Sequence, residues 1–329
     1  MLEHGGHLIE AANKYNIPIQ QWVDLSTGIN PNGWPIPDIP AECWQRLPES
    51  SDGLIETAKK YYQCESILPV AGSQAAIQAL PLLRKKSKVG VLAPAYAEHA
   101  YSWKKAGHEV IELSETTINN QLHKLDVLIL INPNNPTAQK FSKSKLLDWH
   151  QQLIQRNGWL IIDEAFIDST PQYSLSSYPV HDGLIILRSI GKFFGLAGIR
   201  CGFVIANHHI LKQLDELLGP WTISNPSRYI ATAALLDLDW QKKTQVELRQ
   251  QSKRLALLLQ NNSFEMSAQT NLFHWVRTEN AKYIHHSLAQ QGILTRLFDN
   301  PLSLRFGLPK TESQWVHLNQ VLAACSYKL

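Results

Sequence analysis

Seven short apolar runs, each typical of a β-strand, alternate with stretches of helical periodicity between residues 67 and 206. They occupy residues 67–70, 88–93, 109–113, 125–131, 159–163, 184–188 and 202–206. Several are nearly continuous in Val, Ile and Leu, which is expected of parallel strands covered by helices on both faces of a sheet. The pattern predicts a doubly wound α/β domain, in which ligands bind beyond the carboxyl ends of the strands. The polar residues that directly follow these runs are therefore the candidate site residues.

The flanking parts of the chain follow a different pattern. Helical stretches at residues 226–238 and 241–259 precede strand-like runs at 272–277 and 303–309, and a last helix is expected at 312–324. This order is typical of a smaller α+β domain. The first fifty residues are irregular and rich in proline and tryptophan, and we expect them to pack against that domain. We predict a large domain of residues 46–219 and a small domain of residues 1–45 and 220–329.

Composition excludes several classes of function. The chain has 329 residues, of which 44% are hydrophobic and 18% charged, an ordinary globular balance. Because the net charge is only +3 and scattered, neither nucleic acid nor an anionic membrane is an expected partner. There is no apolar run of about 18 residues and no signal-peptide core, so we expect a cytoplasmic protein. Four dispersed cysteines indicate neither a metal site nor a disulfide framework: Cys43, Cys64, Cys201 and Cys325.

The most informative strand end lies in residues 184–206. Its first apolar run leads through Ser189 to Lys192, and a loop punctuated by glycines then reaches Arg200. Glycines allow a backbone to bend sharply and to approach a ligand closely. A lysine between a strand end and such a loop is well placed to act as a buried amine nucleophile, although a solvated lysine beside a turn also fits.

Four other strand ends carry polar or aromatic residues with two interpretations each. Ser73, in a Gly-Ser turn that opens a helix, suits a bound phosphate or simple N-capping. Tyr96 fits a ring laid over a flat ligand or a core residue. Asn135 belongs to a rigid turn of two Asn-Pro pairs, which presents amide side chains or is only structural. Asp163 would cap a helix or hold a proton on a heterocyclic nitrogen.

The order and spacing of these residues are more specific than any one of them. Asn135 precedes Asp163 by 28 positions (163 − 135), and Asp163 precedes Lys192 by 29 (192 − 163). Over nearly its whole length the chain resembles the fold type I enzymes that depend on pyridoxal 5′-phosphate, in the class I and II aminotransferase group. The resemblance implies a mostly parallel sheet between helices in a large domain, a smaller α+β domain, and a homodimer.

The resemblance also implies roles for the strand-end residues. Lys192 would bond covalently to the aldehyde carbon of the cofactor, and Asp163 would keep its pyridine nitrogen protonated. Asn135 would donate to its phenolate oxygen, and Tyr96 would stack on its ring. The remaining residues would bind its phosphate, with arginine as a charge-assisted partner: Gly72, Ser73, Gln74, Ser189 and Arg200.

A narrower resemblance comes from residues 4–7 (HGGH), 24–33, 219–235 and 292–309. These segments are similar to the L-threonine-O-3-phosphate decarboxylases of cobalamin biosynthesis. The implied reaction removes CO2 from L-threonine O-3-phosphate and leaves (R)-1-amino-2-propanol O-phosphate. Two alternatives stay open: a histidinol-phosphate-type aminotransferase acting on a phosphorylated amine, and a non-catalytic binding protein on the same fold.

The same resemblance implies the residues that bind substrate. Arg305 would anchor the carboxylate with its planar fork, with Asn30 as a second contact, and Arg296 and His4 would bind the substrate phosphate. The two arginines are nine positions apart (305 − 296). On one straight strand an odd separation would put them on opposite faces, but a turn at residues 300–301 allows both to converge.

The chain departs from the family pattern at three positions. Phe166 stands where aminotransferases commonly have tyrosine, which removes one hydroxyl near the cofactor oxygen. Leu47 replaces the tyrosine of a Tyr-Pro pair that reaches the neighbouring subunit's cofactor phosphate, and Gly191 stands where Ser or Thr is usual before the lysine. These departures remove donors from the expected phosphate site and are compatible with the decarboxylase branch.

Overall fold

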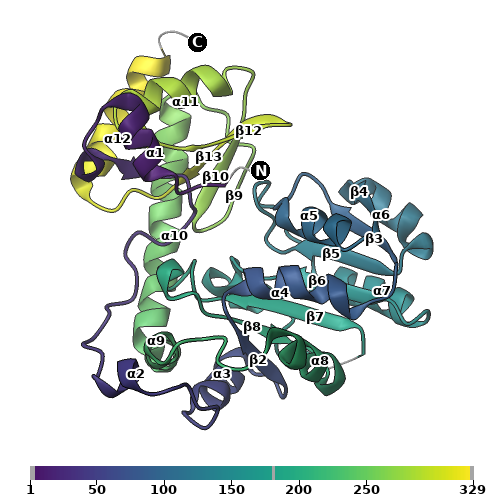
Figure 1. The fold of residues 1–329 in the computed structure, drawn as a ribbon. Coiled ribbons are helices and arrows are strands. Elements are labelled where there is room, and N and C mark those ends of the chain that lie inside the picture. Colours follow the sequence, from purple (N-terminus) through teal and green to yellow (C-terminus); the bar gives the residue numbers. More distant parts are fainter. Residues whose placement is uncertain (1–3, 180–181, 327–329) are drawn as a thin grey trace. The chain divides into compact units, whose positions relative to one another are not determined.

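The computed structural model describes residues 4–179 and 182–326 (Figure 1). Within them the chain forms two compact units. The large unit comprises the described residues of 33–135 and 140–242, and the small unit those of 1–32, 136–139 and 243–329. Helix α10, Leu238–Asn261, contributes residues to both units.

A seven-stranded sheet forms the centre of the large unit (Figure 1). Its strands are β2 (Ile67–Val70), β3 (Lys88–Leu92), β4 (Glu109–Leu113), β5 (Val127–Ile131), β6 (Trp159–Asp163), β7 (Leu184–Ser189) and β8 (Gly202–Ile205). Their order across the sheet is β2-β8-β7-β6-β5-β3-β4. The five strands from β7 to β4 are parallel, and β8 runs antiparallel to both of its neighbours. All seven predicted runs are thus strands, and the predicted mostly parallel α/β sheet is confirmed.

Helices cover both faces of this sheet, as near-continuous apolar strands require. On one face, residues of α4, α5 and α8 pack into a core with alternate strand residues such as Ile129, Ile161 and Ile185. The intervening strand residues are also buried, and α7 packs against β6. The helices of the large unit are α2 (Glu42–Gln45), α3 (Leu54–Tyr62), α4 (Ser73–Ala79), α5 (Glu98–Lys105), α6 (Glu115–Gln121), α7 (Lys143–Ile154), α8 (His208–Leu218) and α9 (Asn225–Leu236).

The small unit combines a four-stranded antiparallel sheet with helices. The sheet has the order β12-β13-β10-β9, and β1 pairs in parallel with β11. Its strands are β1 (Val23–Asp24), β9 (Ala268–Gln269), β10 (Phe273–Arg277), β11 (Ile293–Leu294), β12 (Arg296–Asp299) and β13 (Leu302–Gly307), and its helices include α1 (Leu8–Tyr15), α11 (Ala281–Ala289) and α12 (Glu312–Ser326). Leu25 joins the N-terminal segment to this unit, since its N–H donates to Leu294 O (2.8 Å) and its carbonyl accepts from Gly307 N (2.7 Å). The described residues up to Asn32 therefore belong to the same unit as the C-terminal part of the chain, whereas residues 33–45, for which the same was expected, belong to the large unit.

The structure also bears on membranes and metals. No helix among residues 4–179 and 182–326 combines the length and the apolar character needed to cross a membrane. In the same ranges, no group of three or more His, Cys, Asp and Glu side chains is close enough to hold a metal ion. The four cysteines are free thiols, of which Cys201 and Cys325 are buried.

Candidate functional site

Asp163 lies at the carboxyl end of β6, near the middle of the large unit's sheet. Its side chain is 4% exposed, and its Oδ2 lies 3.0 Å from Nε2 of His99. Its Oδ1 accepts a hydrogen bond from Ala165 N (3.0 Å). The 3-10 helix that follows, Ile167–Ser169, has Phe166 at its N-cap, so Asp163 does not cap a helix. The carboxylate is instead held in one orientation beside a histidine.

His99 was not singled out by the sequence pattern. It is 1% exposed near the start of α5, three residues after Tyr96, and the two rings meet edge to face with centroids 6.3 Å apart. Tyr96 precedes the helix, so helical spacing alone gave no signal for His99. Its contact with Asp163 makes it the partner that orients the carboxylate.

Lys192 lies in the loop between β7 and β8, and its side chain is partly buried. The two residues after it, Phe193 and Phe194, are 0% exposed and fix the backbone of the loop in the core. Lys192 Nζ lies 5.4 Å from the ring centroid of Phe166, a distance typical of a cation–π contact. This lysine is partly buried and lies over an aromatic ring, which favours the interpretation as an amine nucleophile.

Backbone and side-chain donors gather where β2, β7 and β8 adjoin. Gly72 has φ +72°, and a Cβ at that position would lie 2.6 Å from Nη2 of Arg200. A Cβ on Gly202 would lie 2.7 Å from the backbone N of Ser73. Ser189 pairs directly with Gly202 across the two strands, and its Oγ accepts from Gly191 N (3.2 Å). The structure thus brings together the residues predicted to bind a phosphate.

Ser73 itself does not cap the helix that it opens. It is the first residue of α4, the N-cap position is Gly72, and the cap makes no side-chain hydrogen bond. The N-capping explanation for this serine is therefore wrong. As the first residue of the helix, it has its amide close to Gly202, and its neighbour Gly72 lies against the Arg200 guanidinium, which is an arrangement suited to an anion.

Tyr96 and Gln74 belong to one hydrogen-bonded chain that ends in a carboxylate. Tyr96 Oη donates to Gln74 Oε1 (3.2 Å), and Gln74 Nε2 donates to Glu98 Oε2 (2.8 Å). Burial, and then the negative charges of Glu98 and Asp163, raise the pKa of Tyr96 to about 12. Tyr96 and Asp163 both contact His99, which links the phenol to the carboxylate. Glu98 is a further site residue that the sequence pattern did not indicate.

The Asn-Pro turn after β5 contains three asparagines, two of which stabilise the turn itself. Asn132 Oδ1 accepts from Phe141 N (2.9 Å), and Asn134 Nδ2 donates to Pro94 O (2.9 Å). Both side chains are 0% exposed, so they hold the turn together. Asn135 is partly exposed at the end of this turn. Its assignment to the cofactor oxygen stays a prediction.

The small unit has its own concentration of positive charge. Arg296 on β12 and Arg305 on β13 are direct partners in the antiparallel register, so their side chains project from the same face. Arg305 is 4% exposed and donates to the backbone carbonyl of Ser26, while Arg296 Nη1 donates to His4 O (2.9 Å). The predicted convergence of the two arginines is confirmed.

Burial alters the acidity of this pair. Burial first, and then the neighbouring charge of Arg296, lower the pKa of Arg305 to about 9, against the opposing effect of Asp24. Two guanidinium groups side by side are stable when anions lie between or beside them. The arrangement therefore favours a ligand that carries more than one negative charge.

The two N-terminal glycines explain how His4 reaches this place. A Cβ on Gly5 would lie 2.5 Å from Ser26 O, and Gly6 has φ +87°. Gly6 N donates to Ser26 Oγ (2.8 Å), so the segment lies directly on the residues that follow β1. Asn30, another predicted site residue, is 3% exposed and accepts from Asn32 N (3.0 Å). His4, Asn30, Arg296 and Arg305 thus all belong to one unit.

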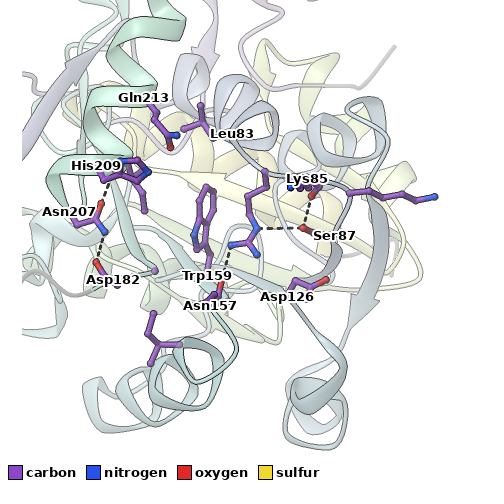
Figure 2. Close-up of a pocket in the computed structure, with 16 residues that line it drawn as sticks. Leu83, Lys85, Ser87, Asp126, Asn157, Trp159, Asp182, Asn207, His209 and Gln213 are labelled. Atoms are coloured by element: carbon purple, nitrogen blue, oxygen red, sulfur yellow. Dashed lines mark hydrogen bonds between the residues drawn. The ribbon is translucent and has the colours of Figure 1, made fainter.

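A cavity of about 760 Å³ lies at the other edge of the large unit's sheet (Figure 2). Its lining includes Asp126 and Gly183, which directly precede β5 and β7. Three of its lining residues contact one another: the Arg84 guanidinium lies 4.7 Å from the ring centroid of Trp159 and donates to Asn157 O (3.0 Å). No candidate site residue lines the cavity. The large unit's candidate residues instead gather at the carboxyl edge, where an α/β fold binds ligands.

These strand ends define an α/β protein built to hold a phosphorylated cofactor beside a lysine. Residues 47–317 match the aminotransferase class I and II family. A threonine-phosphate decarboxylase from Pseudomonas aeruginosa is 49% identical over 322 residues, covering 98% of this chain and 97% of that protein. Another, from Sinorhizobium sp., is 36% identical and covers 93% of this chain and 92% of that protein. The chain therefore belongs to the aminotransferase class I and II family.

Solved structures agree on the fold. A histidinol-phosphate aminotransferase from Sinorhizobium meliloti, in complex with pyridoxal-5′-phosphate, has a TM-score of 0.84 to this chain. It is 16% identical and covers 100% of this chain and 99% of its own. At that identity the similarity concerns the fold, which is the predicted fold type I architecture.

The residues of the large unit fit pyridoxal 5′-phosphate. Only glycine at position 72 leaves room for the Arg200 guanidinium, and only glycine at 202 leaves the Ser73 amide uncovered. Gly191, where relatives have a hydroxyl residue, is also constrained, because a Cβ there would lie 3.2 Å from Ala197 Cα. A side chain at position 191 would therefore require Ala197 to shift by a few tenths of an ångström.

Proposed function

We propose that the protein is a pyridoxal 5′-phosphate-dependent decarboxylase that converts L-threonine O-3-phosphate to (R)-1-amino-2-propanol O-phosphate and CO2 in cobalamin biosynthesis. The observation that carries this proposal is the 49% identity, over 98% of the chain, to a threonine-phosphate decarboxylase. The paired arginines of β12 and β13 support it, since this substrate has two anionic groups a few bonds apart.

The cofactor would be held by the carboxyl edge of the large unit's sheet. Lys192 would supply the amine for its aldehyde carbon, Asp163 would keep its ring nitrogen protonated, and His99 would orient that carboxylate. Asn135 would donate to its phenolate oxygen, and Tyr96 would cover its ring. The residues that would bind its phosphate are Gly72, Ser73, Gln74, Ser189 and Arg200. When bound, the cofactor supplies an electron sink for the negative charge that develops at Cα as CO2 leaves.

Substrate binding is assigned to the small unit. Arg305 binds the carboxylate with Asn30, and Arg296 binds the phosphate with His4. The pKa of Arg305 is lowered in the free protein. A bound anion stabilises the charged form of its guanidinium and would therefore raise this pKa again. A strong ion pair with the carboxylate also stabilises the substrate before reaction, so the rate advantage must come from contacts that strengthen as CO2 departs.

Phe166 gives the lysine an apolar neighbour. Its ring lies under Lys192 Nζ at 5.4 Å and is 4% exposed. Where aminotransferases have a hydroxyl, this chain offers no hydrogen-bond donor. We assign Phe166 to holding Lys192 without adding a proton donor close to the cofactor oxygen.

The proposal includes a cytoplasmic homodimer. Its support in this chain is a set of exposed apolar side chains on two packed helices of the large unit, α2 and α9. Trp44 on α2 is 67% exposed, and Leu236 on α9 is 60% exposed. Contiguous exposed apolar surface commonly marks an interface, whereas single exposed apolar side chains do not, so the homodimer rests mainly on the family resemblance. We also propose a cofactor-binding domain of residues 46–219 and a smaller domain of residues 1–45 and 220–329. The two compact units differ from these bounds at residues 33–45, 136–139 and 220–242.

The decisive experiment is the identification of the product. The purified protein is incubated with the cofactor and O-phospho-L-threonine, and CO2 and 1-amino-2-propanol O-phosphate are measured. A parallel incubation with 2-oxoglutarate tests for transamination. Formation of glutamate without CO2 release would replace the decarboxylase by an aminotransferase.

A further inference from the structure

Arg188 is a fully buried cation that the functional assignment does not use. It is 2% exposed at the carboxyl end of β7, next to Ser189. Its Nη1 donates to Glu164 Oε2 (2.7 Å), and its Nη2 donates to Asp168 Oδ1. Both carboxylates are 0% exposed. One guanidinium therefore joins two buried carboxylates of the same short segment.

That segment carries Phe166 at its centre. Glu164 and Asp168 lie two residues before and two residues after Phe166, so Arg188 ties down both of its ends. Phe166 in turn lies under Lys192 Nζ. The position of the ring beneath the lysine is thus set by an ion pair on each side of it.

Further contacts hold the carboxylates themselves. Glu164 accepts from Leu175 N (2.9 Å) and from the hydroxyl of Ser174, and Asp168 accepts from Tyr61 Oη (3.1 Å). The Arg188 guanidinium also lies 4.4 Å from the ring centroid of Tyr62. We call Arg188, Glu164, Asp168, Ser174 and Tyr61 the Arg188 cluster. Each charged member makes at least one hydrogen bond within the cluster, although Arg188 Nε and Asp168 Oδ2 are buried without a hydrogen-bond partner among the described residues.

The alternation of side chains places this cluster behind the site. Glu164 follows Asp163, and Arg188 precedes Ser189, so these two cluster residues are chain neighbours of predicted cofactor ligands. Successive side chains in an extended strand point to opposite faces. Glu164 and Arg188 therefore connect β6 and β7 from one face, while Asp163 and Ser189 project from the other.

We propose that Arg188 is a positioning residue, which sets Phe166 beneath Lys192 and holds Asp163 and Ser189 in register for the cofactor. This inference rests on the proposed function only in that the chain must bind pyridoxal 5′-phosphate. It involves no contact between Arg188 and the cofactor. Lysine at this position would keep the charge but lose the planar fork that reaches two carboxylates at once.

The test compares two Arg-to-Lys variants as holoenzymes. Arg188→Lys should raise the cofactor dissociation constant about tenfold or more, and move the pH midpoint of the bound cofactor's visible absorption band by about half a pH unit. Arg228→Lys is the matched control, because Arg228 makes a two-bond ion pair with Asp52 (2.6 and 2.7 Å) elsewhere in the large unit. The control should lose thermal stability while keeping the wild-type affinity and midpoint.

The inference is overturned if folded Arg188→Lys matches the Arg228→Lys control in both cofactor affinity and midpoint. If Arg188→Lys does not fold, Asp168→Asn replaces it, since this change loosens one end of the Phe166 segment and keeps an acceptor. The same shifts, at smaller size, are then expected, and unchanged values would overturn the inference. A wild-type protein with no visible band would refute the proposed function, and with it this inference.

Discussion

Arg296 and Arg305 stand directly opposite each other on two antiparallel strands of the small unit. The two residues are nine positions apart in the sequence, and the turn between the strands brings their cationic side chains side by side on one face of the sheet. Arg305 is buried, and its pKa is lowered to about 9, first by that burial and then by Arg296. The free protein thus maintains an unfavourable pair of like charges, which an anionic ligand would relieve.

The two arginines should have separable roles in binding. Arg305→Ala should weaken both L-threonine and its phosphate, because the carboxylate is common to them. Arg296→Ala should weaken mainly the phosphorylated ligand, by about 1.5–3 kcal/mol for a lost charged hydrogen bond. Calorimetric titration of both ligands against both variants measures this.

Arg277→Ala is the matched control for this pair. Arg277 is an exposed arginine on β10, in the same sheet, and its loss should leave both affinities unchanged. Equal weakening of L-threonine and its phosphate in Arg296→Ala would contradict the assignment of that arginine to the phosphate.

Lys192 should be the lysine that bonds to the cofactor. The wild-type protein is expected to be yellow, and Lys192→Ala should lose the visible absorption band, because Lys192 is the lysine assigned to the cofactor at the carboxyl edge of the sheet, over Phe166. Borohydride reduction followed by peptide mass spectrometry identifies the modified residue. Attachment of the cofactor to another lysine would show that the central assignment is wrong.

Asp163→Asn should keep the cofactor but lose activity on the order of a hundredfold, because an amide cannot stabilise a protonated ring nitrogen. The matched control is Asp126→Asn, at the amino edge of the same sheet, where Asp126 Oδ2 accepts from Lys88 N (2.7 Å). That variant should retain wild-type turnover. The turnover numbers of both variants are measured by steady-state kinetics. Full activity in Asp163→Asn would show that this carboxylate has only a structural role.

The strands and the residues at their ends could be predicted because the signals are local. Seven apolar runs became seven strands, and the polar residues after them gathered at one edge, as the chain direction of parallel strands requires. The convergence of the two arginines also followed from a local turn. Ser73 shows the limit of such reasoning, since a shift of one residue at the start of α4 changes a cap into a helical position.

Pairings between distant segments could not be predicted. His99 and Asp163 are 64 positions apart and meet only because the helix after β3 packs over the sheet near β6. The partners of Arg188 lie 20 and 24 positions away, on a segment with no regular periodicity. No local pattern encodes such contacts, because they depend on the order of strands across the sheet.

His274 makes the small unit sensitive to acid. It is 0% exposed on β10, with Nε2 3.0 Å from Ser252 Oγ and Nδ1 2.9 Å from Met266 Sδ. Burial lowers the pKa of His274 to about 4 in the folded protein. The unfolded chain, with an ordinary histidine pKa of about 6.5, takes up the proton first as the pH falls. The contribution of this residue to stability is therefore complete above pH 6.5 and declines between pH 6.5 and 4.

We accordingly expect the free energy of unfolding to fall by about 2 kcal/mol between pH 7.5 and pH 5 through His274 alone. His274→Gln removes the titrating group and should show a pH dependence smaller by that amount, although its stability at neutral pH is lower. His209→Gln, at an exposed histidine of the large unit, should keep the wild-type pH dependence. Unfolding of the three holoenzymes in urea is followed by circular dichroism at both pH values. The free energies of unfolding at pH 7.5 and pH 5 are then compared for each protein. If wild type and His274→Gln lose the same stability on acidification, then the buried ring of His274 does not resist protonation in the fold.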